Sequence, residues 1–370
     1  LTDTAMAAAA VAPMAQRTLG SAVHTVLEWA PELAPQGSTR TAAGIEQAWT
    51  TLAEASPAAA SAPALPFTGP WLLAPMEGVT EPVFLELVLS RNSAEHLGGA
   101  FTEFVRVTDH PIPKKRLAAR LALAPFETPV GLQLMGADLA ALAETARNAE
   151  EAGAPVLDLN FGCPAKGALR GCAGSATLTD PSRVKEIVQA CRAAVSEIPV
   201  TAKMRAGFDD DTLLEENVRA AEAGGAALVT VHCRTKAERY CPELDWTRLA
   251  RAVEAAEGPV CGNGGVKTHA DLERMRRETG CQLVMVGHGA LANPWIFSGV
   301  RVTPAEAARF LLEYSERLCA AGAPTKGSVQ RVKQLLVHWT AGGLCEDRAG
   351  WLRERAPETL LSRLREVASS

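Results

Sequence analysis

A cysteine at the carboxyl end of an apolar run is the residue of this chain best placed to do chemistry. Residues 156–159 (VLDL) are typical of a buried strand, and the turn 160–164 (NFGCP) follows directly. Gly162 permits close backbone approach and Pro164 stops the strand, so Cys163 is held at the strand end. A thiol in that position is available, as an acid or a reactive sulfur, to whatever binds over the end of a parallel sheet.

Polar neighbours distinguish Cys163 from an inert cysteine. An isolated cysteine is more often a small buried apolar residue. Here Asn160, three residues earlier, offers an amide that both donates and accepts hydrogen bonds. Lys166 and Arg170 follow, and cations near a thiol change its acidity and reactivity. We therefore interpret Cys163 as a site residue.

Composition narrows the class of protein. With 370 residues, of which 47% are hydrophobic, the chain can bury the core of one large domain plus a small one. It has no apolar run of membrane-spanning length, and its first residues lack the basic region of a signal peptide, so we predict a cytoplasmic protein without a membrane partner. The nine cysteines are odd in number and contain no CxxC pair, which indicates reduced thiols and no metal site.

The distribution of charge leaves two interpretations open. A net charge of −5 argues weakly against a nucleic-acid partner. However, residues 106–120 carry five cations and one acid, and residues 303–370 carry ten cations and eight acids. Each segment is either a solvated charged face or a binding surface.

From Trp71 onward, short apolar runs alternate with amphipathic segments, which predicts an α/β fold. Eight such alternations are the pattern of a (β/α)8 TIM barrel, with its active site at the carboxyl ends of the strands. The expected strands are Trp71–Met76, Ala100–Val105, Val130–Met135, Val156–Asn160, Val200–Arg205, Leu228–His232, Val260–Asn263 and Leu283–Gly287. The expected helices between them include Asp138–Ala152, Pro181–Val195, Thr212–Ala223 and His269–Thr279.

We divide the chain into three parts. An Ala- and Pro-rich extension, expected to be poorly ordered, covers residues 1–68; the barrel covers 69–301, and a small C-terminal helical domain covers 302–370. In the last part Val332, Leu335, Leu336 and Trp339 share one helix face. That face belongs either to an ordinary packing helix or to a domain that clamps a substrate.

Polar residues follow every expected strand, so a shared cavity at the strand ends is the simplest account. The last two strand ends carry glycine-rich turns, which suit a phosphate group but also serve as tight turns. The strand-end residues are Pro75 to Glu77, Glu103 to Arg106, Gln133, Asn160 to Cys163, Lys203 and Arg205, His232 and Arg234, Asn263 to Gly265, and Gly287 to Gly289.

Eight motifs together give the chain a specific resemblance. They are LAPMEGVT at 73–80, TEFVRVTD at 102–109, LNFGCPAK at 159–166, AGSATLTDP at 173–181, AKMRAG at 202–207, VHCRTK at 231–236, GNGG at 262–265 and VMVGHGALANPW at 284–295. From Trp71 to about Leu364 the chain resembles the tRNA-dihydrouridine synthase family, flavin-dependent reductases of uridine in tRNA. TEFVRVTD, with VQRVKQLL at 329–336, is most similar to the bacterial subgroup that acts on uridine 16 of the D-loop.

The resemblance implies a role for each matched residue. Cys163 matches the proton donor, Asn160 and Arg205 match residues that hold the target base, and His232 matches the histidine beside the flavin. Positions around the ring of FMN are matched by Pro75, Met76, Glu77, Gln133 and Lys203, and those of the phosphate cradle by Asn263, Gly264, Gly265, Gly287 and His288. The subgroup's tRNA contacts are matched by Arg106, Arg331 and Lys333.

The implied reaction needs a cofactor, because no side chain supplies the hydride that reduces the C5=C6 bond of uracil. FMN, reduced by NADPH or NADH, would supply it at C6, while Cys163 protonates C5. One departure stands at position 288, where His288 replaces the family's usual Arg, so flavin affinity is expected to be lower or more sensitive to pH.

The partners expected are tRNA and a nicotinamide nucleotide, with the protein acting as a monomer. Two alternatives remain at this stage: an FMN barrel reductase of a free pyrimidine or a dihydroorotate-like molecule, and a flavin-free RNA-binding homologue.

Overall fold

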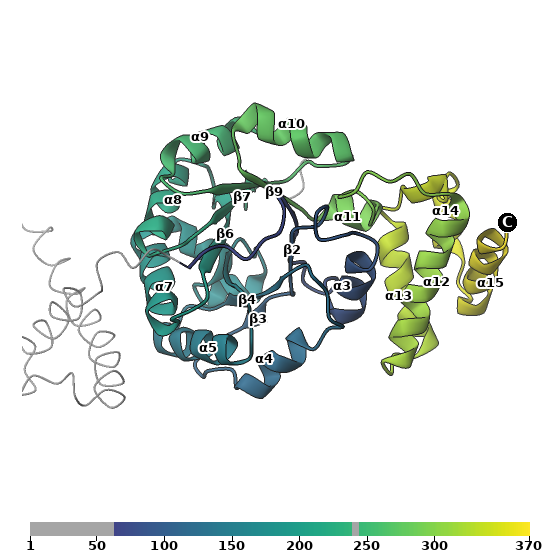
Figure 1. Ribbon diagram of the computed structural model, residues 1–370, viewed down its shortest axis with the longest axis horizontal. Coiled ribbons are helices and arrows are strands. Elements are labelled where there is room, and N and C mark those ends of the chain that lie inside the picture. The colour runs from purple at the N-terminus through teal and green to yellow at the C-terminus, as the bar shows by residue number, and fades with distance from the viewer. Residues whose placement is uncertain (1–62, 239–243) are drawn as a thin grey trace, which may run out of the picture. The chain divides into compact units, whose positions relative to one another are not determined.

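Eight parallel strands close into a barrel in the computed structural model, which describes residues 63–238 and 244–370 (Figure 1). The first strand, β1, pairs with β2 and β9, and β2 also pairs with β4, which closes the ring. The predicted (β/α)8 barrel is thereby confirmed. The barrel strands are β1 (Trp71–Leu73), β2 (Gly99–Phe101), β4 (Val130–Met135), β5 (Leu157–Phe161), β6 (Val200–Gly207), β7 (Val229–Thr235), β8 (Val260–Asn263) and β9 (Leu283–Val286).

Helices follow the strands and begin where the sequence provides caps. Asp138 accepts a hydrogen bond from the backbone N of Ala141 at the start of α5, and Asp180 precedes Pro181, the first residue of α7. All four predicted helices are present, with ends within two residues of prediction. The helices of the barrel are α3 (Pro82–Leu89), α4 (Lys114–Leu121), α5 (Leu139–Glu151), α6 (Lys166–Arg170), α7 (Pro181–Ala194), α8 (Leu214–Ala223), α9 (Thr247–Ala255), α10 (His269–Thr279) and α11 (His288–Ala292).

The second predicted strand, Ala100–Val105, is wrong in one respect, because the chain leaves the sheet at Thr102. It returns as the short strand β3 (Val105–Arg106), which pairs with the far end of β4. In the interval the Glu103 carboxylate accepts hydrogen bonds from Gly78 N at 2.8 Å and Arg120 Nη1 at 2.6 Å. These contacts draw the backbone away from the ladder and set Arg106 at the rim of the barrel.

Apolar side chains fill the amino-terminal half of the barrel interior. Leu72, Phe101 and Met285 are buried there, and Leu65 and Phe67 pack against this cluster. The Phe67 and Phe101 rings lie edge to face, with centroids 5.9 Å apart. Residues 63–68, which we had grouped with the extension, therefore contact the barrel, while residues 1–62 of that extension lie outside the described part of the chain.

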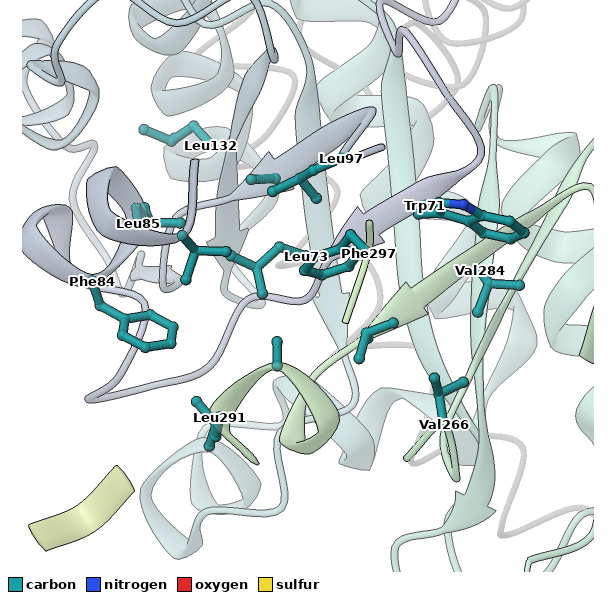
Figure 2. Packing of buried hydrophobic residues seen from close by; sticks show 14 of the residues in the cluster. Trp71, Leu73, Phe84, Leu85, Leu97, Leu132, Val266, Val284, Leu291 and Phe297 are labelled. Atoms are coloured by element: carbon teal, nitrogen blue, oxygen red, sulfur yellow. The ribbon is translucent and has the colours of Figure 1, made fainter. Parts of the chain in front are cut away.

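A larger core lies between the strands and the surrounding helices. Figure 2 shows Leu73 of β1 close to Leu85 of α3 and to Phe297, and all three are fully buried. The core continues into the C-terminal helices α12 (Pro304–Ala320), α13 (Thr325–Leu336), α14 (Arg348–Arg353) and α15 (Pro357–Ala368). In the described part of the chain, no helix combines the length and apolar character needed to cross a membrane.

The C-terminal helices join the barrel through a contact between α12 and α3. The Tyr314 hydroxyl donates to Glu81 Oε1 at 3.0 Å, and its ring packs edge to face on Phe84 with centroids 5.9 Å apart. The apolar face predicted on α13 is core, because Val332 and Leu336 are fully buried. Trp339, which was predicted on the same helix face, follows the end of α13 and is also fully buried. That face therefore packs inside the protein, and a tRNA contact from these helices has to come from other side chains.

We predict that Trp339→Ala lowers the free energy of unfolding by about 3–5 kcal/mol, because the indole is fully buried and packs against the Phe310 ring at 5.7 Å between centroids. Val337→Ala is the matched control, since that side chain is 47% exposed and the change should stay within about 0.5 kcal/mol. Urea unfolding followed by circular dichroism measures both. Equal losses in the two variants would contradict the packing described.

Candidate active site

The barrel interior turns from apolar to polar along β5. Val156 belongs to the apolar cluster, whereas the Asp158 carboxylate, two residues on, accepts hydrogen bonds from Gln133 Nε2 and Thr201 Oγ1, both at 2.6 Å. Asn160 lies a further two residues along and donates from Nδ2 to Gln133 Oε1 at 2.8 Å. Successive residues of a strand alternate faces, so this spacing places both polar side chains on the face that looks into the barrel.

Cys163 lies on a turn that Asn160 holds in place. The side-chain oxygen of Asn160 accepts hydrogen bonds from Gly162 N at 3.0 Å and Cys163 N at 2.9 Å. On the other side, the backbone N and Oγ of Ser175 both donate to Cys163 O at 3.0 Å. The close approach requires Gly174, whose φ is +61° and where a Cβ would lie 2.7 Å from Cys163 O.

The Cys163 side chain is nearly covered, with 7% of its surface exposed, and it packs with Met135, Ala168 and Ala173. Burial raises the pKa of the Cys163 thiol, against the opposing effect of a hydrogen bond from the Ala165 backbone. The thiol is therefore protonated at neutral pH. It is suited to donate a proton and poorly suited to act as a thiolate nucleophile.

Two cations of β6 face the same end of the barrel. Lys203 is partly buried, and burial lowers the pKa of its amine to about 8 while Asp158 opposes that shift. Arg205 donates from Nε to Gly162 O at 2.8 Å and from Nη1 to Thr235 O at 3.1 Å. The Arg205 guanidinium thus links the Cys163 turn to β7.

His232, which lies within β7 three residues before its end, is held as a neutral ring. Burial lowers the pKa of His232 well below its usual value, and the nearby Lys203 and Arg205 add to the shift. Its Nδ1 lies 3.2 Å from the backbone N of Arg234, which can only donate, so the ring proton resides on Nε2. His232 can therefore donate one hydrogen bond into the barrel mouth.

Basic side chains gather where the phosphate site was predicted. The His288 and His338 rings lie edge to face with centroids 5.3 Å apart, and burial, with contributions from His338 and Arg234, lowers the pKa of His288. Arg234 Nε is buried and has no hydrogen-bond partner among the described residues. Arg234 was noticed as a strand-end residue but given no role; its position two residues after His232, on the same strand face, is the signal for it.

The glycine turns at the ends of β8 and β9 are also structural requirements. Gly264 has a φ of +112°, and a Cβ there would lie 2.7 Å from Cys233 Sγ. Asn263 donates from Nδ2 to Met285 O at 2.7 Å, which ties β8 to β9. Gly265 has a φ of +82°, and a Cβ on Gly287 would lie 3.5 Å from Met76 Sδ. The ends of β1, β8 and β9 therefore meet, and the role of these residues as a phosphate cradle stays a prediction.

The rim of the barrel carries a cleft of about 380 Å³ beside the Cys163 turn. Met135 and Ala168 contact both the cleft and the Cys163 cluster. Arg106 donates from Nη2 to Gly167 O at 2.6 Å, which connects the rim to α6. The cleft is lined by Glu77, Glu103, Phe104, Val105, Arg106, Arg116, Arg120, Met135, Ala165 and Ala168.

Both residues of α13 that are predicted to contact tRNA also have contacts within the protein. Lys333 Nζ donates to Leu352 O at 3.1 Å and also to Glu354 O. Arg331 donates to Gly78 O and lies 3.8 Å from Glu81 Oε1, so it joins α13 to the loop after β1. Lys333 is thus not brought to the barrel mouth, whereas Arg331 reaches its edge.

The donor set at the mouth fits a bound flavin phosphate. Arg234 lies near His288, whose ring packs against that of His338. Among the residues that the structure describes, the buried Arg234 Nε has no hydrogen-bond partner, and an anionic group with several acceptor oxygens would satisfy it. The mouth of this parallel barrel thus brings these donors together with a thiol and the partly buried Lys203, at the strand ends where barrels of this kind have their active sites.

Comparison with known proteins identifies the family. Residues 72–335 match the family model "Dihydrouridine synthase (Dus)". The chain is similar to the tRNA-dihydrouridine(16) synthase of Shewanella oneidensis, with 36% identity over 258 residues, or 66% of this chain and 81% of that protein. It is 40% identical to the enzyme of the same name from Pseudomonas syringae, over 60% of this chain and 71% of that protein. With the Haemophilus influenzae enzyme of that name it shares 40% identity over 60% and 74% of the two chains. The chain belongs to the dihydrouridine synthase family, and it is an oxidoreductase that acts on uridine in tRNA.

We predict that Gly174→Ala loosens the Cys163 turn, because alanine disfavours a φ of +61° and its Cβ would press on Cys163 O. The free energy of unfolding should fall by about 1–3 kcal/mol, and iodoacetamide should modify Cys163 faster. Gly171→Ala is the control, since its φ is −94° and a Cβ would meet nothing closer than 3.6 Å. Mass spectrometry follows the alkylation. A Gly174→Ala protein as stable and as slowly alkylated as the wild type would contradict the role given to Gly174.

Proposed function

We propose that this protein reduces uridine 16 in the D-loop of tRNA, with FMN as its flavin and NADPH or NADH as the reductant. Relatives with 36–40% identity that carry the name tRNA-dihydrouridine(16) synthase support the position of the base. The observation that carries the chemistry is the protonated Cys163 thiol on a turn fixed by Asn160, at the mouth of the barrel.

The strand ends would hold the cofactor. Bound FMN supplies the hydride that no side chain can deliver. The Lys203 amine, with its pKa lowered to about 8, is still largely protonated at neutral pH and would stabilise negative charge on the flavin ring. The residues proposed to contact the ring are Pro75, Met76, Glu77, Gln133, Lys203 and His232, and those proposed to hold the phosphate are Asn263, Gly264, Gly265, Gly287, His288 and, in addition, Arg234.

Asn160 and Arg205 would hold the base. The side-chain oxygen of Asn160 already accepts two hydrogen bonds, and Nδ2 uses one hydrogen on Gln133, so one N–H remains for a ligand. A single donor suits a carbonyl oxygen of uracil and opposes the amino group of cytosine. Arg205, fixed by Gly162 O and Thr235 O, adds positive charge beside that edge.

Cys163 would protonate C5 of the base. Because Ala168 and Ala173 cover the sulfur, we propose that residues 164–173 shift when a base enters from the rim cleft. The base must also leave its stack to reach the barrel, and a tRNA loop offers such a base at low cost. The thiol then transfers its proton and takes it back from solvent when the loop reopens.

The tRNA would lie over the rim cleft and the adjoining C-terminal helices. Arg106, Arg116 and Arg120 line the cleft, and Arg331 reaches the loop after β1. Guanidinium groups pair with phosphate oxygens, and Phe104 offers a ring on which a base can stack. In this proposal residues 69–301 bind FMN, residues 302–370 support the tRNA, and Lys333 stabilises the helical part. The protein would work as a monomer in the cytoplasm, without a metal.

We predict that Cys163→Ala lowers the rate of tRNA reduction at least about 100-fold, while FMN binding and reduction of the flavin by NADPH are retained. The thiol provides a proton and makes no contact that a flavin would need. Cys172→Ala is the control, because that thiol is exposed on the same loop. Dihydrouridine is measured in tRNA by mass spectrometry. Turnover at the wild-type rate in Cys163→Ala would remove the proton-donor role.

We predict that Arg116→Glu weakens tRNA binding roughly ten-fold, since Arg116 is exposed and lines the rim cleft. The slope of the logarithm of affinity against the logarithm of salt concentration should fall by about the amount that one phosphate contact contributes. Arg219→Glu makes the same charge change on α8, which packs against α7 and α9, and should leave affinity unchanged. Filter binding at several salt concentrations measures both. Equal effects of the two variants would refute a specific contact at the cleft.

A further inference from the structure

A continuous chain of hydrogen bonds runs from the interior of the barrel to the Cys163 turn. It crosses three strands, with Thr201 on β6, Asp158 and Asn160 on β5, and Gln133 on β4. Each bond is 2.6–3.0 Å long, and the Asp158 and Gln133 side chains are fully buried. The bonds are Thr201 Oγ1 to Asp158 Oδ1, Gln133 Nε2 to Asp158 Oδ2, Asn160 Nδ2 to Gln133 Oε1, and Gly162 N and Cys163 N to Asn160 Oδ1.

The hydrogen-bonding groups at the two ends fix the direction of this series of hydrogen bonds. At the inner end, both oxygens of Asp158 accept hydrogen bonds, one from Thr201 Oγ1 and one from Gln133 Nε2, and burial raises the pKa of this carboxyl to about 6. At the outer end, the backbone N–H groups of Gly162 and Cys163 can only donate. The two amides between them can satisfy both ends in one orientation alone. Reversing Gln133 would set its carbonyl oxygen against the carboxylate.

We propose that Asp158 is a positioning residue of the active site, which orients the Gln133 and Asn160 amides and through them fixes the turn that carries Cys163. Asp158 itself is too deep to touch a base, because its side chain is fully buried and both oxygens are already engaged. Asp158 affects Cys163 indirectly, because an oriented Gln133 amide presents its oxygen to Asn160 Nδ2, and an oriented Asn160 amide presents its oxygen to Cys163 N. A reversed Asn160 would turn its N–H groups against two backbone donors and release the turn.

A second role for Asp158 has to be separated from this one. Lys203 lies near Asp158, and each favours the charged form of the other. If Asp158 served only as a counter-charge, loss of its negative charge would be harmful and an added carboxylate nearby would be tolerated. If Asp158 positions the amides, protection of Cys163 depends on the donor-to-acceptor direction of the hydrogen bonds more than on the negative charge at position 158. The two roles therefore predict opposite rankings of variants.

Three variants make that distinction. Gln133→Glu places a second carboxylate where Asp158 needs a donor, so the bond between positions 133 and 158 is lost. Repulsion between the two carboxylates then pushes the side chain at position 133 out of the place from which it orients Asn160. Asp158→Asn can keep the chain, because the new amide accepts from Gln133 through its oxygen and donates to the Thr201 hydroxyl oxygen. The double variant Asp158→Asn with Gln133→Glu exchanges amide and carboxylate, so that position 133 accepts from position 158 and from Asn160. Gln334→Glu, the same change at an exposed position, is the control.

The measurement is the rate at which iodoacetamide modifies Cys163 in the full-length protein, with the midpoint of urea unfolding recorded alongside. We expect Gln133→Glu to be alkylated at least about ten times faster than the wild type, since release of the turn exposes the sulfur. Asp158→Asn, the double variant and the control should stay within about threefold of the wild type. Wild-type protection in Gln133→Glu, or alkylation of Asp158→Asn as fast as that of Gln133→Glu, would overturn the proposal.

The design remains decisive if Gln133→Glu does not fold. In that case a folded double variant with a protected Cys163 supports the proposal, and a double variant that also fails to fold overturns it. Alkylation requires neither flavin nor tRNA. If the protein did not reduce uridine 16 of tRNA, the alkylation result would therefore still be valid. If the alkylation result overturned the positioning role of Asp158, the proposed reaction would still be decided by the assay of tRNA reduction.

Discussion

The pair of hydrogen bonds that Asn160 Oδ1 accepts from Gly162 N and Cys163 N is the constraint on which the site depends. It converts the end of β5 into a fixed turn and so determines where the thiol lies relative to the strand ends. A second pair of hydrogen bonds holds the other side of the turn, because the backbone N and Oγ of Ser175 both donate to Cys163 O. With both faces bonded, a side chain on a loop acquires the positional precision of one on a strand.

That precision relies on polar groups buried inside the barrel, where an unpaired group costs more than at the surface. Thr201, Asp158 and Gln133 satisfy one another, so the network rigidifies the interior. Below it, Leu72, Phe101 and Met285 exclude water from the amino-terminal half. The apolar half supplies stability and the polar half supplies orientation, which is the usual division of a barrel between its two ends.

Local patterns were enough to predict most of this fold, because eight apolar runs and capped amphipathic segments have few other arrangements. The interruption of the second strand was not predictable, since it arises from Glu103 binding Gly78 and Arg120, both remote in sequence. Asp158 was overlooked for a similar reason. Within VLDL a single carboxylate looks like an exception in an apolar run, although its spacing of two from Asn160 indicates a shared face.

Cationic residues were the least predictable part of the site. Lys333 satisfies two backbone carbonyl oxygens, and no pattern of charge along a helix distinguishes that from a cation that awaits a phosphate.

The balance of charge at the strand ends nevertheless has a direct consequence. The strands from β5 to β7 carry one carboxylate, Asp158, and three cations, Lys203, Arg205 and Arg234, while His232 is held neutral. A chain with a net charge of −5 thus carries more positive than negative charge on these three strands, where a phosphate or an electron-rich ring would be stabilised. Neutrality of His232 is part of that balance, because burial and the neighbouring Lys203 and Arg205 disfavour a further positive charge. His288 follows the same rule, since burial and the nearby charge of Arg234 lower the pKa of its ring.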